Sequence, residues 1–210
     1  MCGIFGFVSK SNTTPNMRVL EKIAEVTMTR GPHAWGMAWA DRSGVVRTYK
    51  QSGRIVDVLP LLAMAQDAVM LAGHCRYATH GDPSDNLNNH PHDARDAWVI
   101  HNGVISEYLE LAKRHKLRRH TECDSEVLAL MVGRFKGSPL ARVKRAVDEA
   151  MGSRPLSMMA LWPDRMIAAR ANNQPLSIGE TSDSFYLASL PSGLPGRVSP
   201  MKNNEIVEFA

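Results

Sequence analysis

The first residues of the chain could form a nucleophile. Cys2 follows the initiator Met1 and leads into an apolar, strand-like run at residues 3–8. The cysteine side chain is small enough to permit removal of Met1, which would leave a thiol and a free α-amine on one residue. An N-terminal nucleophile uses this pair, because the side chain attacks while the amine takes the proton. The alternative is an ordinary cysteine near the end of the chain.

A second group of residues could bind an anion. Arg76 lies where the chain leaves an apolar run at residues 68–73, and Thr79 and His80 follow within reach of the same anion. The planar guanidinium of arginine can form two parallel hydrogen bonds with one carboxylate. The alternative is that Arg76 pairs with an internal aspartate.

A third group could stabilise developing charge and bind an amine. Asn102 and Gly103 follow a short apolar run, and the asparagine amide and the next N–H are adjacent donors, as in an oxyanion hole. Asp124 could bind a substrate ammonium. The alternatives are a plain Asn-Gly turn and, for Asp124, the N-cap of the next helix.

The elements that must position these residues are short. Hydrophobic periodicity predicts helices at residues 15–28, 55–66, 106–115, 125–135 and 140–151. Strands are predicted at residues 4–8, 35–40, 45–50, 68–73, 97–101, 156–162, 165–169, 175–179, 184–188 and 205–209. Strands at both ends with helices between them suggest two sheets covered by helices.

Composition and charge exclude several classes of protein. Of the 210 residues, 44% are hydrophobic, and the net charge of +4 is only mildly basic. There is no basic stripe with interleaved aromatic residues, so we expect no nucleic-acid partner. No signal segment and no apolar run of about 18 residues is present, so we expect neither secretion nor a membrane. Three cysteines without a C-x-x-C pair fit a reducing compartment, and we expect a cytoplasmic protein.

Five histidines could suggest a metal site: His74, His80, His90, His92 and His101. No carboxylate accompanies them at a recognisable metal-ligand spacing. We therefore expect no metal and no cofactor, and we expect these histidines to brace loops through hydrogen bonds.

Taken together and in order, the motifs resemble the class II glutamine amidotransferase domain, most closely the glutaminase half of glucosamine phosphate synthase. The resemblance covers essentially the whole chain, and the order of the motifs makes it specific. It implies an α+β fold, the four-layer αββα sandwich of the N-terminal nucleophile hydrolases, as a single domain over residues 2–210 with Met1 removed. The motifs are Met-Cys-Gly-Ile at the start, Arg30-Gly31, Arg76-Tyr77-Ala78-Thr79-His80-Gly81, Asn89-His90-Pro91-His92, His101-Asn102-Gly103-Val104-Ile105 and Glu122-Cys123-Asp124-Ser125-Glu126-Val127.

The resemblance implies roles for the residues that would carry the chemistry. Cys2 would be the nucleophile, with its own freed amine as the base. The side chain of Asn102 and the N–H of Gly103 would hold the oxyanion. Arg30 resembles the structural arginine that the family has near the nucleophile.

The resemblance also implies roles in substrate binding. Arg76 would bind the α-carboxylate of glutamine with help from Thr79 and His80. Asp124 would bind the α-ammonium together with the carbonyl of Gly103. These charges suit a zwitterionic amino acid at one end of a pocket, and a thiol with an oxyanion hole suits an amide at the other end.

Two positions depart from the family. Tyr77 stands where the family usually has tryptophan after the clamping arginine, and His33 stands where aspartate commonly follows the Arg-Gly turn. Both departures concern the geometry around the clamp more than the chemistry.

The implied reaction is hydrolysis of glutamine through a Cys2 thioester, giving glutamate and ammonia. We expect the ammonia to pass to a separate synthase, because no acceptor domain is recognisable in the chain. One alternative is an N-terminal cysteine hydrolase that acts on another amide, and a second is a catalytically silent binding module of the same fold.

Two expectations concern this partner. The long polar loop at residues 76–95 begins at the clamp, and we expect it to be mobile until ligand or partner closes over it. The basic run at residues 113–119 is usually a solvated face, but exposed like charges also steer association. We therefore expect the acceptor to dock there.

Overall fold

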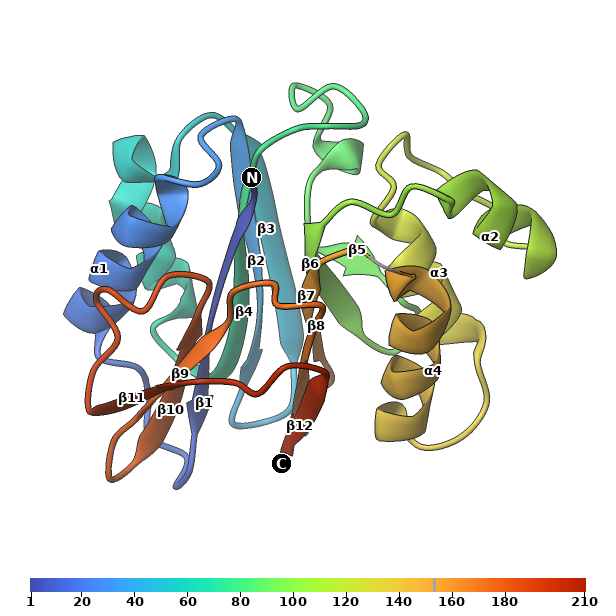
Figure 1. Ribbon diagram of the computed structural model, residues 1–210. Helices are drawn as coiled ribbons and strands as arrows, with labels where there is room; N and C mark the ends of the chain where they lie inside the picture. Colours follow the sequence, from blue (N-terminus) through green and yellow to red (C-terminus); the bar gives the residue numbers. More distant parts are fainter. Residues whose placement is uncertain (153) are drawn as a thin grey trace.

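The computed structural model describes residues 1–152 and 154–210. In this part of the chain, two antiparallel sheets face each other and helices cover both outer faces (Figure 1). The prediction of an α+β fold with four αββα layers is confirmed.

The larger sheet places β1 near its centre. Its seven strands lie in the order β11-β9-β10-β1-β4-β2-β3. Helix α1 and the 3-10 segment η1 cover its outer face (Figure 1). The elements of these two layers are β1 (Gly3–Ser9), α1 (Met17–Met28), β2 (Ala34–Asp41), β3 (Val46–Ser52), η1 (Ile55–Ala65), β4 (Ala68–Arg76), β9 (Ser177–Glu180), β10 (Ser184–Ala188) and β11 (Arg197–Pro200).

The smaller sheet has five strands in the order β12-β8-β7-β6-β5. Helices α2, α3 and α4 cover its outer face (Figure 1). No helix in the described part of the chain is long and apolar enough to cross a lipid bilayer. The elements of these layers are η2 (Asn86–Asn88), β5 (His92–Asp93), β6 (Trp98–Gly103), α2 (Tyr108–Arg114), α3 (Glu126–Arg134), α4 (Pro139–Met151), β7 (Leu156–Leu161), β8 (Met166–Ala171) and β12 (Glu205–Phe209).

Three apolar clusters separate the four layers. Neighbouring residues of a strand point to opposite faces, so Ile4 packs with Ile100 between the sheets while Phe5 packs with Leu20 beneath α1. Leu128 of α3 belongs to the third cluster, on the outer face of the smaller sheet. Because both faces of β1 are buried, the strand reads as a continuous apolar run.

The structure differs from the sequence predictions in a few elements. The run predicted as a helix at residues 55–66 forms 3-10 turns and contains Pro60, which lacks the N–H that an α-helix needs at that position. The long loop after Arg76 is not without structure, because it contains η2 and β5. Strands β5 and β11 were not predicted, and their short polar sequences carry no alternating hydrophobic pattern.

A matched pair of leucine substitutions tests which surfaces form the core. Leu71 on β4 is fully buried, whereas Leu109 on α2 is 56% exposed. Leu71→Ala should lower the free energy of unfolding by roughly 2–5 kcal/mol, because it removes buried methyl groups and leaves a cavity. Leu109→Ala should change it by less than about 0.5 kcal/mol. Urea unfolding of both variants measures the difference, and equal effects would contradict this assignment of the core.

Candidate active site

Cys2 lies at the end of the central strand of the larger sheet, directly before β1. The backbone of Tyr77 holds its sulfur on two sides: the N–H donates to Sγ over 3.3 Å, and Sγ donates to the carbonyl oxygen over 3.4 Å. Burial raises the pKa of the Cys2 thiol, although the Tyr77 hydrogen bond, the N-terminal amine and Arg76 act in the opposite direction. A thiol that stays protonated at neutral pH needs a base when it attacks.

Asn102 on β6 is tied to the start of β1 through Ser189. Asn102 Nδ2 donates to Ser189 Oγ over 3.2 Å, and the same oxygen accepts the backbone N–H of Ile4 over 3.0 Å. The amide carries two N–H groups, so one of them remains for a ligand. Ser189 thus fixes the position of Asn102 relative to Cys2, two residues before Ile4.

Gly103 lies where the backbone passes close to its neighbours. A Cβ atom at this position would lie 2.6 Å from the carbonyl oxygen of Pro155 and 2.7 Å from Nε2 of His101. A larger residue would force these segments apart, so the close approach requires glycine.

A cavity of about 250 Å³ joins these groups. Cys2, Thr79, Asn102 and Gly103 all line it, although Cys2 and Asn102 are about one hundred positions apart in the sequence. The structure therefore brings the three predicted catalytic residues to one place. A thiol and two amide donors around one cavity can attack a carbonyl carbon and stabilise the resulting oxyanion.

Arg76 is buried at the end of β4, and its guanidinium binds its own loop. Nη1 donates to Oδ1 of Asn89 over 2.8 Å, and Nη2 donates to the carbonyl oxygens of His80 and, over 3.0 Å, Gly81. These partners are an amide and two carbonyls, so the alternative that Arg76 pairs with an internal aspartate is wrong. A substrate carboxylate that binds the Arg76 guanidinium through two parallel hydrogen bonds therefore has to displace the carbonyl oxygens of His80 and Gly81 from Nη2.

Asp124 is buried and fixed by one strong contact. Its Oδ2 accepts the backbone N–H of Ile105 over 2.7 Å. Helix α3 begins at Glu126 with Ser125 as its N-cap, so the alternative that Asp124 caps the helix is wrong. Its second oxygen, Oδ1, makes only long contacts and can accept a further donor.

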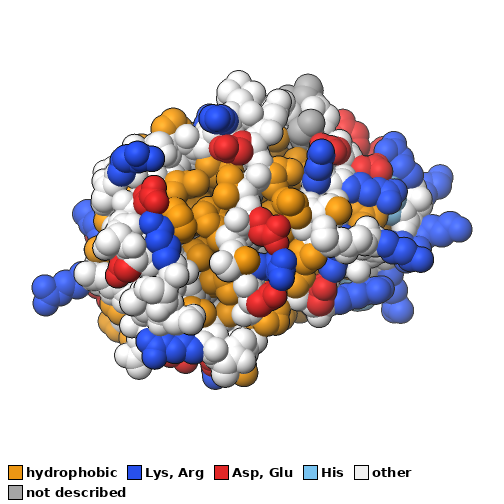
Figure 2. Space-filling view, turned by 90° about the horizontal axis from the view of Figure 1, so that it is seen from below, with side chains coloured by type: hydrophobic (Ala, Val, Ile, Leu, Met, Phe, Trp, Pro, Cys, Tyr) orange, Lys and Arg blue, Asp and Glu red, His pale blue; other side chains and the backbone are white. Residues whose placement is uncertain are grey.

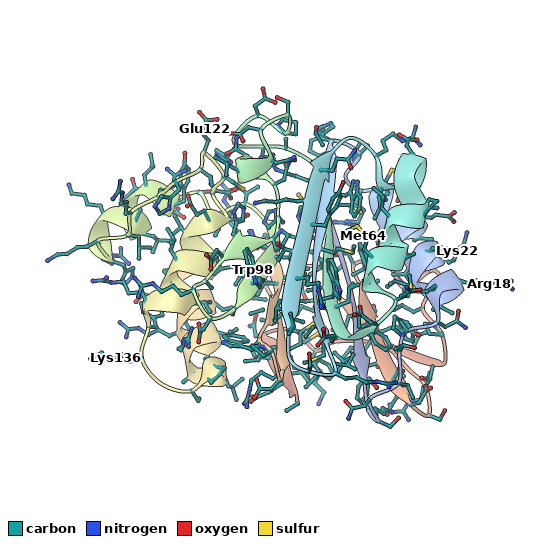
Figure 3. All side chains as sticks on the ribbon, turned by 180° about the vertical axis from the view of Figure 1, so that it is seen from behind. Arg18, Lys22, Met64, Trp98, Glu122 and Lys136 are labelled. Carbon is teal, nitrogen blue, oxygen red and sulfur yellow. The ribbon has the colours of Figure 1, made fainter. Side chains whose placement is uncertain are left out.

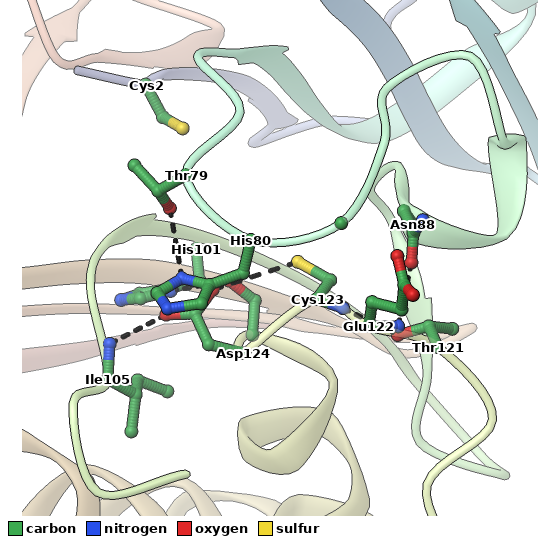
Figure 4. Close-up of polar contacts among 12 residues, drawn as sticks. Cys2, Thr79, His80, Asn88, His101, Ile105, Thr121, Glu122, Cys123 and Asp124 are labelled. Atoms are coloured by element: carbon green, nitrogen blue, oxygen red, sulfur yellow. Dashed lines mark hydrogen bonds and ion pairs between the residues drawn. The ribbon is translucent and has the colours of Figure 1, made fainter.

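Thr79 and His80 lie between Cys2 and Asp124, as Figure 4 shows. His80 Nδ1 lies 3.3 Å from Thr79 Oγ1 and 3.8 Å from Asp124 Oδ1. Thr79 lines the cavity with Cys2, whereas Arg76, His80 and Asp124 do not line it. The predicted substrate-binding residues thus form a second group beside the cavity, connected to it through Thr79.

Arg30 contacts the nucleophile through the backbone. Its Nε donates to the carbonyl oxygen of Cys2 over 2.8 Å, and burial lowers the pKa of its guanidinium while Cys2 acts in the opposite direction. Arg30 therefore holds the chain segment that carries the Cys2 thiol.

Met1 is 71% exposed and lines the same cavity as Cys2.

The two departures from the family contact each other. The rings of His33 and Tyr77 lie 4.7 Å apart between centroids, and His33 Nδ1 accepts the backbone N–H of Ala78 over 3.0 Å. The backbone of Tyr77 is the segment that brackets the Cys2 sulfur. Both departures therefore support the loop that holds the thiol.

The buried histidines fall into two groups. His74 Nε2 donates to the carbonyl oxygen of His101 over 3.1 Å, and His101 Nδ1 lies 2.9 Å from Ser125 Oγ, as expected for histidines that brace loops. Neither ring nitrogen of His90, nor Nε2 of His92, forms a hydrogen bond with the described residues. The expectation of bracing hydrogen bonds is therefore wrong for His90.

Four residues at the site were not identified from the sequence. Ser189 fixes Asn102, and Arg154, Pro155 and Gln174 line the cavity. All four lie in the C-terminal part of the chain, outside every recognised motif. The only signal in the sequence was that Ser189 directly follows a predicted strand.

No protein-family model matches the chain. The glutamine–fructose-6-phosphate aminotransferase (isomerizing) of Clostridium tetani is 32% identical over 220 residues, which cover 99% of this chain and 35% of that protein. The protein of the same name from Pyrobaculum aerophilum is 35% identical over 190 residues, covering 85% of this chain and 31% of that protein. The chain thus spans about a third of the length of these relatives.

Solved structures share the fold. Glutamine phosphoribosylpyrophosphate amidotransferase from B. subtilis has a TM-score of 0.82 at 20% identity, over 99% of this chain and 47% of that chain. A glutamine aminotransferase class-II domain protein from Silicibacter pomeroyi has a TM-score of 0.67 at 16% identity, over 99% of this chain and 94% of that chain. The identity to the aminotransferases and the shared fold lead to one conclusion: this chain belongs to the class II glutamine amidotransferase domain family, with the fold of the N-terminal nucleophile hydrolases.

Proposed function

We propose that the mature chain hydrolyses the side-chain amide of glutamine and releases glutamate and ammonia. The observation that carries this proposal is the cavity of about 250 Å³ shared by Cys2, Asn102 and Gly103. Relatives that carry glutamine in their names match the whole length of the chain, which favours glutamine over another amide.

The nucleophile acts after Met1 is removed. The freed α-amine of Cys2 takes the thiol proton while Sγ forms a bond to the amide carbon of the substrate. This base is needed because burial raises the pKa of the thiol, whereas an α-amine titrates near about 7.7–8.0. An uncleaved Met1 would convert the amine into an amide and remove the base.

The negative charge then develops on the former carbonyl oxygen. The free N–H of Asn102 and the backbone N–H of Gly103 stabilise this oxyanion. Collapse of the tetrahedral intermediate breaks the C–N bond, and the ammonium of Cys2 gives its proton to the departing nitrogen, which leaves as ammonia. Water then adds to the thioester carbon while the α-amine of Cys2 takes its proton, which forms a second oxyanion. When this intermediate collapses, the C–S bond breaks, the amine returns the proton to the sulfur, and glutamate leaves.

The amino-acid end of glutamine binds beside the cavity. Arg76 takes the α-carboxylate after its Nη2 leaves the carbonyl oxygens of His80 and Gly81, with Thr79 lining the path. Asp124 Oδ1 accepts the α-ammonium, since Oδ2 is already occupied by the N–H of Ile105. Substrate binding in this arrangement requires the loop at residues 77–87 to move.

The start of the mature chain gives a first test. The intact mass of active protein should be lower than that of the full sequence by one methionine, and Cys2→Ser should lose most turnover because a hydroxyl is far less ionised than a thiol. Mass spectrometry and a glutamate-release assay measure both. Activity in a population that uniformly keeps Met1 would refute the amine base, and full activity of Cys2→Ser would refute the nucleophile.

A second test separates chemistry from binding. Asn102→Ala should lower kcat by roughly 10²–10³, because one oxyanion donor is lost. Arg76→Lys should mainly raise KM, because a point charge cannot reproduce the two parallel bonds of the guanidinium. Steady-state kinetics distinguish the two effects, with thermal unfolding as the control for folding. A change in KM alone for Asn102→Ala would contradict the oxyanion assignment.

We further propose that the ammonia passes to an acceptor synthase on a separate chain. Figure 2 displays Lys and Arg side chains gathered over the half of the molecule that holds α2, α3 and α4. Lys113, Arg114, Lys116 and Arg118 are exposed there. Within the described part of the chain, Arg114 is the only one of them with an ion-pair partner, Glu149 at 3.4 Å. This charge suits an acidic docking surface.

Neutralising these charges tests the docking surface. Replacement of Lys113, Arg114 and Lys116 by glutamine should weaken binding of the acceptor at low salt, with a smaller loss at high salt where the charges are screened. Basal glutaminase activity should not change. The acceptor is first isolated by co-purification, and affinity is then measured by calorimetry.

The matched control removes cations from the opposite face. Arg18 and Lys22 on α1 are exposed at the far end of the molecule, as Figure 3 shows, and Arg54 is exposed near the start of η1. Glutamine at these three positions should leave the affinity at its wild-type value. Equal losses for both triple variants would indicate a general charge effect and exclude a docking surface at residues 113–119.

A further inference from the structure

Two histidines and a cysteine meet beside the proposed substrate site. One ligand atom from each of His90, His92 and Cys123 lies within 4.8 Å of the other two, and the three residues are at most 3% exposed. Both ring nitrogens of His90 and Nε2 of His92 form no hydrogen bond with the described residues. Buried polar atoms almost always have a partner, so these nitrogens point to a ligand.

The backbone that carries the three residues is fixed by contacts of its own. Lys50 on β3 donates to the carbonyl oxygens of Asn89 and Pro91 over 2.9 and 3.3 Å, on either side of His90. The N–H of Glu122 donates to Oδ1 of Asn88 over 2.8 Å, which joins the segment before His90 to the segment before Cys123 (Figure 4). The ligand atoms are therefore held near one another before anything binds.

The donor set selects a class of metal ion. Two imidazoles and a thiolate suit a borderline-soft divalent ion such as Zn²⁺, whereas Mg²⁺ and Ca²⁺ prefer oxygen ligands. In a tetrahedral zinc site the ligand atoms lie about 3.3–3.6 Å apart. The present spacing of up to 4.8 Å is about 1 Å wider than this range, so the side chains have to move closer together when the ion binds. We propose that His90, His92 and Cys123 form a zinc-binding site with a fourth position open to another ligand.

The charges around the three residues partly compensate one another. Burial lowers the pKa of both histidines well below its usual value, so both imidazoles are neutral and each can offer a lone pair to the metal. The positive charges of Lys50 and Arg76 oppose a bound cation. The thiolate itself and the carboxylate of Asp124, whose Oδ1 lies 3.9 Å from the Cys123 sulfur, act in the other direction.

One of the three proposed ligands, His92, lines a cleft through which an ion could approach. This cleft has a volume of about 660 Å³ and is also lined by Lys50, Trp98 and Arg118. Figure 3 shows Trp98 on the face seen from behind. Among the described residues, the cleft shares no lining residue with the cavity that contains Cys2, so zinc and glutamine would enter through different openings.

Bound zinc would connect the two segments that hold the substrate-binding residues. Asn89, which accepts a hydrogen bond from Arg76, directly precedes His90, and Asp124 directly follows Cys123. The ion would therefore hold the surroundings of Arg76 and Asp124 at a fixed separation. Binding of the metal itself does not depend on the proposed glutaminase activity.

The test uses a chain with Cys123 as its only thiol. The chain has three cysteines, so the double variant Cys2→Ala/Cys75→Ala removes both other thiols and also the proposed nucleophile. Titration of this full-length variant with Co²⁺ should give a thiolate-to-cobalt charge-transfer absorption that saturates at one ion per chain. Zn²⁺ should abolish the absorption, and elemental analysis after dialysis should find one zinc per chain.

Histidine variants in the same background decide the ligand set. His92→Gln should weaken Co²⁺ binding by more than roughly 100-fold. This loss is larger than is typical when the replaced residue only forms a hydrogen bond with a metal ligand. His120→Gln is the matched control, because His120 lines the same cleft but is exposed, and it should bind as the background does. Circular dichroism checks that each variant is folded, and His90→Gln replaces His92→Gln if the latter is not.

Two results would overturn the proposal. The first is no charge-transfer absorption at stoichiometric Co²⁺ in the folded double variant. The second is an absorption that persists unchanged in both His92→Gln and His90→Gln. Since the double variant has no Cys2, either result leaves the proposed glutaminase function standing, and loss of that function in turn leaves the zinc site untouched.

Discussion

Strand β1 (Gly3–Ser9) is hydrogen-bonded along both edges, to β4 on one side and to β10 on the other. Residues 3–8 are all buried, although chain ends are commonly disordered. Pairing on both edges fixes the direction in which the residue before β1 points. A Cβ at Gly3 would lie 2.6 Å from Thr27 Cγ2, so glycine also lets the end of α1 approach and bring Arg30 to the carbonyl of Cys2.

The proposed site also requires the two sheets to keep a constant separation. Cys2 comes from the larger sheet and Asn102 from the smaller one, and the apolar cluster between the sheets sets the distance between them. Close packing leaves little freedom there, since a Cβ at Gly6 would lie 2.9 Å from Sδ of Met159. Ser189 adds the polar contact that aligns the two sheets at the end where the cavity lies. The site thus depends on packing as much as on its own residues.

Much of the fold could be predicted because hydrophobic periodicity reports burial directly. The buried strands and the helices α1, α3 and α4 all carry such a pattern. The pattern does not report hydrogen bonding, so the 3-10 geometry around Pro60 was missed. Hydrophobic periodicity also does not predict β5 and β11, because these strands pair through the backbone and have few apolar residues.

The candidate site was predictable to the extent that its motifs lie at strand ends. The sequence could indicate that Cys2 and Asn102 lie at the edges of sheets, but the partners of Arg76 depend on how its loop folds back. Cys123 was not connected with His90 because more than thirty residues separate them. Such contacts arise from tertiary packing, and no local spacing encodes them.

The contact between His33 and Tyr77 couples the two positions at which the sequence departs from the family. The two rings are tilted against each other with their centroids 4.7 Å apart, and they come from segments more than forty positions apart. Residues in contact do not contribute independently to stability, so the energetic effect of changing one ring depends on which residue stands at the other position. Tyr77 and His33 therefore act as one coupled unit behind the backbone that holds the Cys2 sulfur.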